Sequence, residues 1–354
     1  MNILIASIAC LLLVTPGETS ATEAAKSAAD RAAQEAIVKL KAPGVAVAVE
    51  INGEIVVLRG YGVRDLVSKL PVTSNTHFEI GSISKQFTAA AVLQLAESHR
   101  LSLDDPLGKY VPEYVVGAAI TIRQLLSQTA GVPNFTEGND FMQVAATQKP
   151  SLQAILARID GKPLAFKPGT DWAYSNTNYV LLASVIELVS GETYNQYIAR
   201  HIFRAAGLRD SGFASDEGSF QDMATGYYPN GDVITASPHV DEAWAPGAGT
   251  IVSTLGDMLK WDHALLQGRV VSFKSVNLML DAGTTSSGKS TGYGMGWYND
   301  TEKDHERIWH NGGTFGSSAT NAMFPSDHEI IVIFDNNVAV DAETIASQIF
   351  DATH

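Results

Sequence analysis

Cysteine is nearly absent from this chain of 354 residues, which contains Cys10 and no other. One thiol near the start cannot form an intramolecular disulfide, so the fold has to depend on burial of its core. The Gly-x-Ser-x-Gly pattern occurs only as Gly288-Lys289-Ser290-Thr291-Gly292, in a Gly/Ser/Thr-rich stretch that predicts a loop, so the sequence does not indicate the nucleophile elbow of the α/β-hydrolases. His305 and His328 each precede a glutamate, but neither has the second histidine of a zincin motif. No glycine-rich phosphate loop follows an expected strand, so the sequence indicates neither a metal nor a cofactor.

Basic residues are also scarce, with 24 lysines and arginines against 38 acidic residues and a formal charge of −14. This balance repels phosphate backbones and argues against nucleic acid as a partner. The acidic excess is otherwise typical of a soluble surface. The expected partner is therefore a small-molecule or peptide substrate, and the sequence gives no indication of the oligomeric state.

The only long apolar run near the start extends from Ile3 to Val14, which is too short to span a bilayer. It is followed by Thr15-Pro16-Gly17, and Thr19-Ser20-Ala21 offers small residues for cleavage. These features predict a signal peptide over 1–21. We expect a secreted or periplasmic mature chain without a transmembrane span.

Local patterns predict strands near the N-terminus. An alanine-rich helix is expected from Ala21 to Lys41. The segments Gly44 to Ile51 and Glu54 to Gly60 are separated by Asn52-Gly53, which is the strongest short hairpin signal. A β-hairpin is therefore predicted directly after the first helix.

Helices dominate the middle of the chain, from Ser82 to about Leu208, with breaks at Gly131-Val132-Pro133 and Pro168-Gly169. Strands return at Ser318 to Phe324 and Glu329 to Asn336, and a helix follows near Ala342 to Phe350. Strands at both ends predict one antiparallel sheet shared by the N- and C-terminal parts, with a helical lobe inserted.

The predicted fold class is thus α/β, of the α+β kind. We expect a single catalytic domain over 22–354. Its α/β lobe would comprise 22–81 and about 285–354, and its mostly helical lobe about 82–284.

The first chemical signal is Gly81-Ser82-Ile83-Ser84-Lys85. An apolar run from Phe87 to Ala96 follows, which is too long for a strand and predicts a buried helix with Ser82 in its first turn. Residues three apart lie on one helix face, so Lys85 can reach the Ser82 hydroxyl. Burial disfavours the charged form of a lysine, and a neutral amine is a suitable base for a serine nucleophile.

Two look-alike motifs are expected to be loops. Ser286-Ser287-Gly288-Lys289 has the same serine-to-lysine spacing but no apolar helix behind it. Tyr228-Pro229-Asn230-Gly231 fits Tyr-x-Asn, yet its composition is that of a turn between extended segments.

Two further motifs follow Ser82 in the chain. Tyr174-Ser175-Asn176 opens an apolar helix from Tyr179 to Leu188, and His310-Asn311-Gly312 occurs once. Three motifs in this order, each at the boundary of an element, predict a serine nucleophile with its supporting groups.

On these motifs the chain resembles the penicillin-recognising serine hydrolases: class C β-lactamases, serine D,D-carboxypeptidases, and related D-aminopeptidases and family VIII-type esterases. The resemblance extends to Glu79 to Thr88, Thr121 to Pro133, and Pro246 to Gly249 leading into Ser253-Thr254. It implies a β-lactamase/transpeptidase-like fold, in which terminal helices flank an antiparallel sheet and the active site lies in the cleft beside an inserted, mostly helical lobe.

The resemblance also implies roles for single residues. Ser82 would be the acylated nucleophile and Lys85 its proton-relay partner. Tyr174 would be the general base that later returns a proton to the leaving group. The backbone N–H groups of Ser82 and Gly313 would form the oxyanion hole.

Substrate binding is implied for Asn176, which would hold the acyl amide, and for His310, Asn311 and Gly312. His310 stands where family members often carry lysine. Because histidine is only partly cationic near neutral pH, this replacement predicts weak β-lactamase activity at most.

The substrate stays open among short esters, D-amino-acid peptides and β-lactams. The pocket walls are expected in loops such as Asn134 to Lys149 and Ser211 to Glu242, whose shape the sequence does not define. A hydrolase acting through a covalent acyl-enzyme is the main prediction. The alternative is a penicillin-binding or sensing protein that acylates with little turnover.

Overall fold

The computed structural model describes residues 16–138, 140–148, 150–231, 233–238 and 240–354. The predicted leader falls mostly outside these ranges, so both the signal peptide and the export of the chain stay predictions. None of the helices in the described ranges is long and apolar enough to cross a membrane.

The main sheet has six strands in the order β2-β1-β11-β10-β9-β8, and every neighbouring pair is antiparallel. The N-terminal hairpin thus pairs directly with the last strand of the chain, which confirms the predicted shared sheet. The lobe boundaries stay a prediction. The strands of this sheet are β1 (Gly44–Ile51), β2 (Glu54–Gly62), β8 (Tyr298–Glu302), β9 (His305–Gly313), β10 (Ser318–Phe324) and β11 (Glu329–Asp335).

The predicted hairpin between β1 and β2 is confirmed. Asn52 and Gly53 both have positive φ, 53° and 79°, as a two-residue type I′ turn requires. Asparagine and glycine tolerate this left-handed conformation better than other residues, so the sequence sets the register of the pair.

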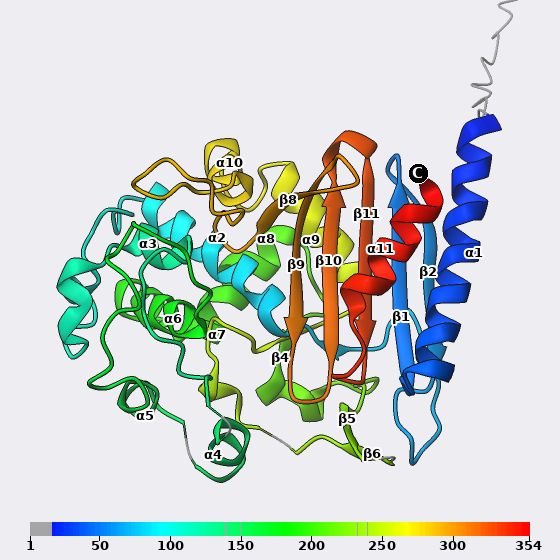
Figure 1. Cartoon of the computed structure of the whole chain (residues 1–354), viewed down its shortest axis with the longest axis horizontal. Helices are drawn as coiled ribbons and strands as arrows, with labels where there is room; N and C mark the ends of the chain where they lie inside the picture. Colours follow the sequence, from blue (N-terminus) through cyan, green and yellow to red (C-terminus); the bar gives the residue numbers. More distant parts are fainter. Residues whose placement is uncertain (1–15, 139, 149, 232, 239) are drawn as a thin grey trace, which may run out of the picture.

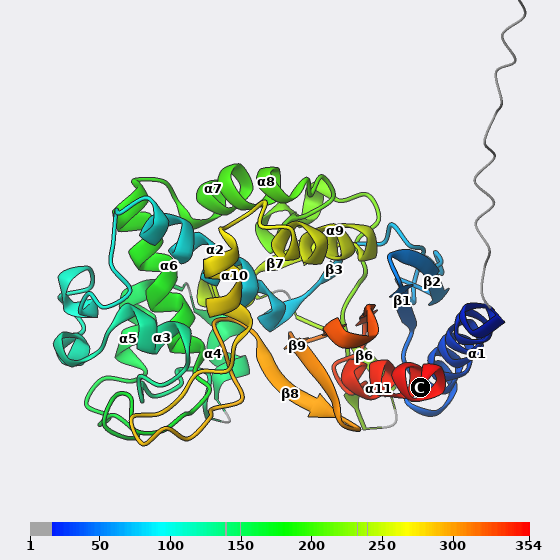
Figure 2. The same cartoon turned by 90° about the horizontal axis from the view of Figure 1, so that it is seen from above.

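Apolar strands bury both faces of this sheet. Val45, Val47 and Val49 of β1 pack in one core cluster with α1 (Pro16–Lys39) and α11 (Ala342–Thr353), whereas Ala46 and Ala48 belong to the cluster of the helical lobe. Side chains alternate between the two faces of a strand, so a run without polar residues indicates a strand covered on both sides. Figures 1 and 2 show α1 and α11 on one side of the sheet and α9 on the other.

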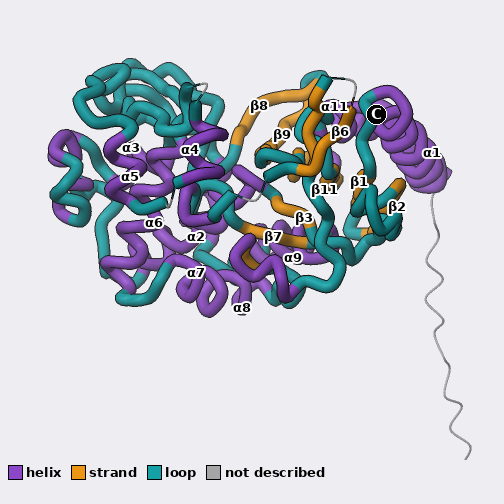
Figure 3. The backbone as a smooth tube through the Cα atoms, turned by 90° about the horizontal axis from the view of Figure 1, so that it is seen from below, coloured by secondary structure: helices purple, strands orange, loops and turns teal. Residues whose placement is uncertain are grey.

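The helical lobe lies beside the β9 and β8 edge of the sheet, at the opposite end from α1 (Figure 3). Two small sheets, β3-β7-β4 and β5-β6, accompany it. The helices are α2 (Ser84–Glu97), α3 (Ile122–Leu126), α4 (Phe141–Thr147), α5 (Leu152–Ala157), α6 (Asn176–Ser190), α7 (Tyr194–Tyr197), α8 (Arg204–Ala206), α9 (Leu255–Leu266) and α10 (Phe273–Leu280). The short strands are β3 (Phe78–Glu79), β4 (Gly212–Phe213), β5 (Tyr227–Asn230), β6 (Val233–Ala236) and β7 (Ile251–Ser253).

Ser286 to Lys289 belong to the loop between α10 and β8, as the sequence predicts. Tyr228 to Asn230 instead lie in strand β5, and only Gly231, with φ of +62°, lies in the turn toward β6, so the expectation of a loop is wrong for most of this motif. Neither serine nor tyrosine in these segments opens a helix.

Candidate active site

Ser82 lies in a tight 3₁₀ turn, η1 (Gly81–Ile83), and not in the first turn of the α-helix, which begins at Ser84. The turn starts at Gly81, whose φ of +50° suits glycine. A Cβ atom on Gly81 would lie 2.6 Å from the Gly313 nitrogen. The turn therefore packs so closely on β9 that a side chain does not fit between them, and this contact sets Ser82 beside the end of the strand.

Lys85 is fully buried and its amine makes three contacts. Nζ lies 2.9 Å from Ser82 Oγ, 2.8 Å from Asn176 Oδ1 and 2.7 Å from the carbonyl oxygen of Ala248. Burial lowers the pKa of Lys85 well below its ordinary value. A neutral amine has two N–H groups for the two pure acceptors, which leaves its lone pair for the proton of Ser82.

Tyr174 precedes α6, and its hydroxyl donates to Ser82 Oγ over 2.7 Å. The backbone before α6 is held by Gln128, whose Oε1 accepts from the Ser175 N–H at 3.0 Å and from Asn178 Nδ2 at 2.6 Å. Burial raises the pKa of the Tyr174 phenol above its usual range. The phenol is therefore neutral and acts as a proton donor in this arrangement.

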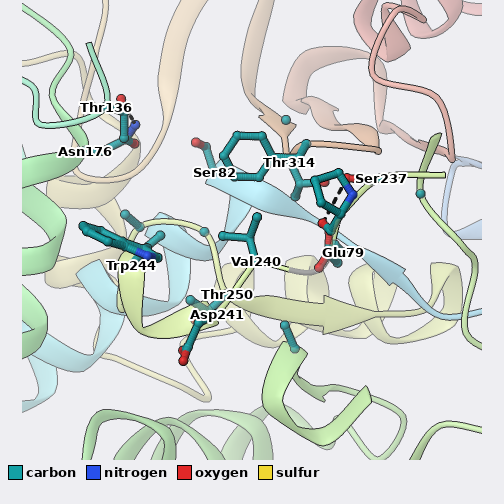
Figure 4. Close-up of a pocket in the computed structure, with 18 of the residues that line it drawn as sticks. Glu79, Ser82, Thr136, Asn176, Ser237, Val240, Asp241, Trp244, Thr250 and Thr314 are labelled. Atoms are coloured by element: carbon teal, nitrogen blue, oxygen red, sulfur yellow. Dashed lines mark hydrogen bonds between the residues drawn. The ribbon is translucent and has the colours of Figure 1, made fainter. Parts of the chain in front are cut away.

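Asn176 begins α6 and connects Lys85 to the cavity. Its Oδ1 accepts from Lys85, and its Nδ2 donates to Thr136 Oγ1 over 3.1 Å. Figure 4 shows Asn176 and Thr136 together on one side of Ser82.

His310 is completely buried on β9. Its Nε2 lies 3.1 Å from the Tyr293 hydroxyl and its Nδ1 lies 2.5 Å from the carbonyl oxygen of Asn311. Burial, together with the nearby Lys85, lowers the pKa of His310 to about 3. The expectation of a partly cationic histidine near neutral pH is therefore wrong, because an imidazole enclosed in this way has no water to stabilise its charge.

The other three predicted site residues on β9, Asn311, Gly312 and Gly313, have different surroundings. Gly312 packs against η1, since a Cβ atom there would lie 1.9 Å from the Ile80 carbonyl oxygen. Gly313 lines the cavity at Ser82. Asn311 alternates to the other side of the strand, its side chain is exposed, and it does not line that cavity. Its predicted part in substrate binding thus has no support from its position.

A cavity of about 360 Å³ opens beside Ser82 (Figure 4). Phe141 contacts two other aromatic residues of the lining. Its ring centroid lies 5.9 Å from that of Trp244 and 6.0 Å from that of Phe315. Among the described residues that line it, none is lysine, arginine or histidine, and the acidic ones are Glu79 and Asp241. The cavity is therefore largely apolar on one side and carries no fixed positive charge.

Sequence reasoning located these walls only by region. Thr136 and Phe141 come from the predicted loop 134–149, of which Phe141–Thr147 form helix α4. Met223, Ser237 and Asp241 are among the lining residues that come from the predicted loop 211–242. Tyr293 and the Ala248 carbonyl, which hold His310 and Lys85, were missed. Ala248 lies in a segment that carried the family resemblance, but a backbone acceptor leaves no trace in residue type.

Comparisons with known proteins agree with this geometry. The family model described as Beta-lactamase matches residues 29–352. The putative penicillin-binding protein PbpX of Bacillus subtilis (strain 168) is 34% identical over 287 residues, which cover 80% of this chain and 68% of that protein. Protein flp of Staphylococcus aureus (strain MW2) is 29% identical over 305 residues, covering 83% of this chain and 59% of flp. Both relatives thus extend beyond the matched region.

Solved structures give the same result. The octameric penicillin-binding protein homologue from Pyrococcus abyssi superposes with a TM-score of 0.81 at 25% identity, covering 92% of this chain and 76% of that one. A D-stereospecific amidohydrolase from Streptomyces sp. gives a TM-score of 0.78 at 25% identity, covering 92% and 98%.

Fold, motifs and family model together define a serine hydrolase of the β-lactamase/transpeptidase-like class. The chain belongs to the β-lactamase family, and its relatives include a putative penicillin-binding protein and a D-stereospecific amidohydrolase.

Proposed function

We propose that this protein hydrolyses uncharged esters or amides with an apolar acyl group through a covalent acyl-enzyme on Ser82. The observation that carries the proposal is a nucleophile flanked by a neutral buried amine and a neutral phenol, beside a cavity without positive charge.

In the acylation step, the Ser82 hydroxyl gives its proton to the Lys85 amine while Oγ attacks the substrate carbonyl. The N–H groups of Ser82 and Gly313 would receive the developing oxyanion. The leaving alcohol or amine takes the proton of the Tyr174 hydroxyl as its bond to the carbonyl carbon breaks.

Deacylation reverses these transfers. A water molecule attacks the acyl carbon and gives a proton to the Tyr174 phenolate, and Lys85 returns its proton to Ser82 Oγ as the acyl group leaves. The products are a carboxylic acid and the regenerated enzyme.

The preference for an uncharged substrate follows from electrostatics. A bound carboxylate would meet Glu79 and Asp241 in the lining, and His310, whose ring centroid lies 6.1 Å from that of Tyr174, is neutral, so no fixed cation offsets the desolvation of the carboxylate. Phe141, Trp244 and Phe315 instead offer aromatic surface to an apolar acyl group. The similarity to a D-stereospecific amidohydrolase supports amides as one arm of the substrate class.

Steady-state kinetics on three substrates test the proposal: a short p-nitrophenyl ester, N-acetyl-D-phenylalanine amide and the carboxylate-bearing β-lactam nitrocefin. We expect kcat/KM for the ester or the amide to exceed that for nitrocefin by at least about tenfold, equivalent to about 1.4 kcal/mol. Ser82→Ala should abolish turnover, and Ser286→Ala, the matched control from the loop motif, should not. A preference for nitrocefin would refute the charge argument.

A second candidate is a penicillin-binding or sensing protein that acylates with little turnover, and the 34% identity to a putative penicillin-binding protein favours it. Incubation with a fluorescent penicillin distinguishes the two. Stable stoichiometric labelling of Ser82, without product from any of the three substrates, would favour this candidate over the hydrolase.

A further inference from the structure

A second group of polar side chains gathers at the far end of β9 from Ser82. His305 begins β9, Asp327 ends the short 3₁₀ turn η7 (Pro325–Asp327), and His354 follows α11. One nitrogen or oxygen from each lies within 4.8 Å of the others. The C-terminal end of α11 lies at the same end of the sheet as the connection between β10 and β11 (Figure 1).

Both histidines point at one carboxylate. His305 Nδ1 lies 2.9 and 3.0 Å from the two oxygens of Asp327, and His354 Nε2 lies 3.3 Å from Oδ1. The two imidazole rings are 4.9 Å apart at an interplanar angle of 61°. Two nitrogens and one oxygen thus converge on a small volume.

The ring of His354 is held in place by its surroundings. Phe350 stacks on it with a centroid distance of 4.2 Å. Nδ1 lies 3.1 Å from Thr353 Oγ1 and 3.3 Å from the carbonyl oxygen of Phe350. Because the carbonyl can only accept, Nδ1 carries the hydrogen, and in a neutral ring the lone pair of Nε2 faces Asp327. A lone pair and a carboxylate oxygen at this distance repel each other, and a proton or a metal cation between them removes that repulsion.

The local charge favours such a cation. Glu329 begins β11 with only 1% of its side chain exposed, and its carboxylate lies 3.7 Å from His354 Nδ1. Within the described ranges, the ion-pair partners of Asp327 and Glu329 are His305 and His354 alone, without lysine or arginine. Asp327 thus faces both imidazoles without competition from a basic side chain of the described residues.

We propose that His305, Asp327 and His354 form a binding site for a divalent transition-metal ion, with zinc as the best match. Imidazole nitrogen and carboxylate oxygen are zinc ligands, and three protein ligands leave a fourth position for water. The side chains are 34%, 14% and 25% exposed, so an ion can enter from solvent. The Phe350 carbonyl and Glu329 lie beside Nδ1 of His354 and orient its ring, as acceptors at the second nitrogen of a metal-bound histidine commonly do.

The site would fasten the end of α11 to the sheet. Its ligands are 22 and 27 residues apart along the chain, from three different elements, so no spacing motif indicates it. An ion bound to all three would hold these elements together and raise the thermal stability of the folded protein.

Titration calorimetry of the untagged protein with zinc chloride tests the proposal, supported by the visible spectrum after cobalt(II) addition. We expect saturable binding of one ion, a rise in Tm, and at least tenfold weaker binding in Asp327→Asn and His354→Gln. His201→Gln is the matched control, because His201 also pairs with a carboxylate, Glu192, at 2.8 Å but at an exposed site without a third ligand.

His354→Gln changes the last residue of the chain, so circular dichroism should show an intact fold. Unchanged zinc affinity in both variants would overturn the proposal. So would the absence of saturable binding in the wild type.

Discussion

Gly312→Ala should lower the catalytic rate although it removes no group that takes part in the reaction. The Cβ atom of an alanine at this position would lie 1.9 Å from the Ile80 carbonyl oxygen and 3.2 Å from the Ser82 nitrogen. Real Cβ atoms essentially never approach a heavy atom more closely than 3.0 Å, so the turn η1 and strand β9 must separate by about 1.1 Å. That movement shifts Ser82 relative to Gly313.

The magnitude follows from this displacement. A misplacement of about 1 Å at reacting groups costs on the order of a hundredfold in rate, because the oxyanion donors no longer meet the carbonyl oxygen. Overpacking of a close backbone contact costs about 1–3 kcal/mol of stability, which the protein should tolerate. We therefore expect kcat/KM to fall about a hundredfold in a folded protein.

Gly256→Ala is the matched control, since it makes the same chemical change in α9, outside the lining of the cavity. A Cβ atom there would meet nothing within 4 Å. The assay is kcat/KM for a short ester, with urea denaturation of both variants. Equal activity of the two variants, or wild-type activity in Gly312→Ala, would show that the close contact of η1 with β9 does not set the geometry of Ser82.

Three further predictions follow from the same structure. Tyr174→Phe should lower kcat by about two to four orders of magnitude through loss of a proton donor, and wild-type turnover in a folded variant would remove Tyr174 from the mechanism. His310→Lys should raise kcat/KM for nitrocefin relative to a neutral ester, whereas the neutral His310→Gln should leave the ratio unchanged; an unchanged ratio in the lysine variant contradicts the charge argument. Burial raises the pKa of Asp262 well above its ordinary value, so the folded state retains a proton that the unfolded chain releases above about pH 4, and stability falls as the pH rises from there. Burial also raises the pKa of Asp335 and Glu329, so Asp262→Asn should make that fall shallower, not remove it, in urea titrations between pH 4 and 8, and a parallel pH dependence in both proteins would refute the prediction.

The fold was largely predictable because its strongest sequence signals, a turn dipeptide and an apolar run, each lie within one short segment. Asn52-Gly53 fixes a hairpin, and the apolar run near 330–334 matches β11. The pairing of β11 with β1 followed from having strands at both ends of the chain. The start of α2 was harder to place, because the 3₁₀ turn at Ser82 results from the tertiary contact of Gly81 with β9.

The site was predictable in its residues but not in their environment. Ser82, Lys85, Tyr174 and Asn176 meet as their motifs indicate, with hydrogen bonds of 2.7 to 2.9 Å. The charge state of His310 was not predictable, because it depends on enclosure by residues such as Tyr293 that no motif connects to it. The cluster of Phe141, Trp244 and Phe315 was missed for the same reason, because the three rings come from separate segments of the chain.

Lys85 shows why environment decides the chemistry in this protein. In water its amine would be charged and could not accept the proton of Ser82. The fold encloses it between α2, α6 and the segment around Ala248, and gives its two N–H groups acceptors in Asn176 Oδ1 and the Ala248 carbonyl. The lone pair then has one direction left, toward Ser82. The serine-to-lysine spacing alone cannot produce this state, since Ser286 and Lys289 have the same spacing in a loop between α10 and β8. A nucleophile therefore requires the burial that the helical lobe supplies as much as the motif itself.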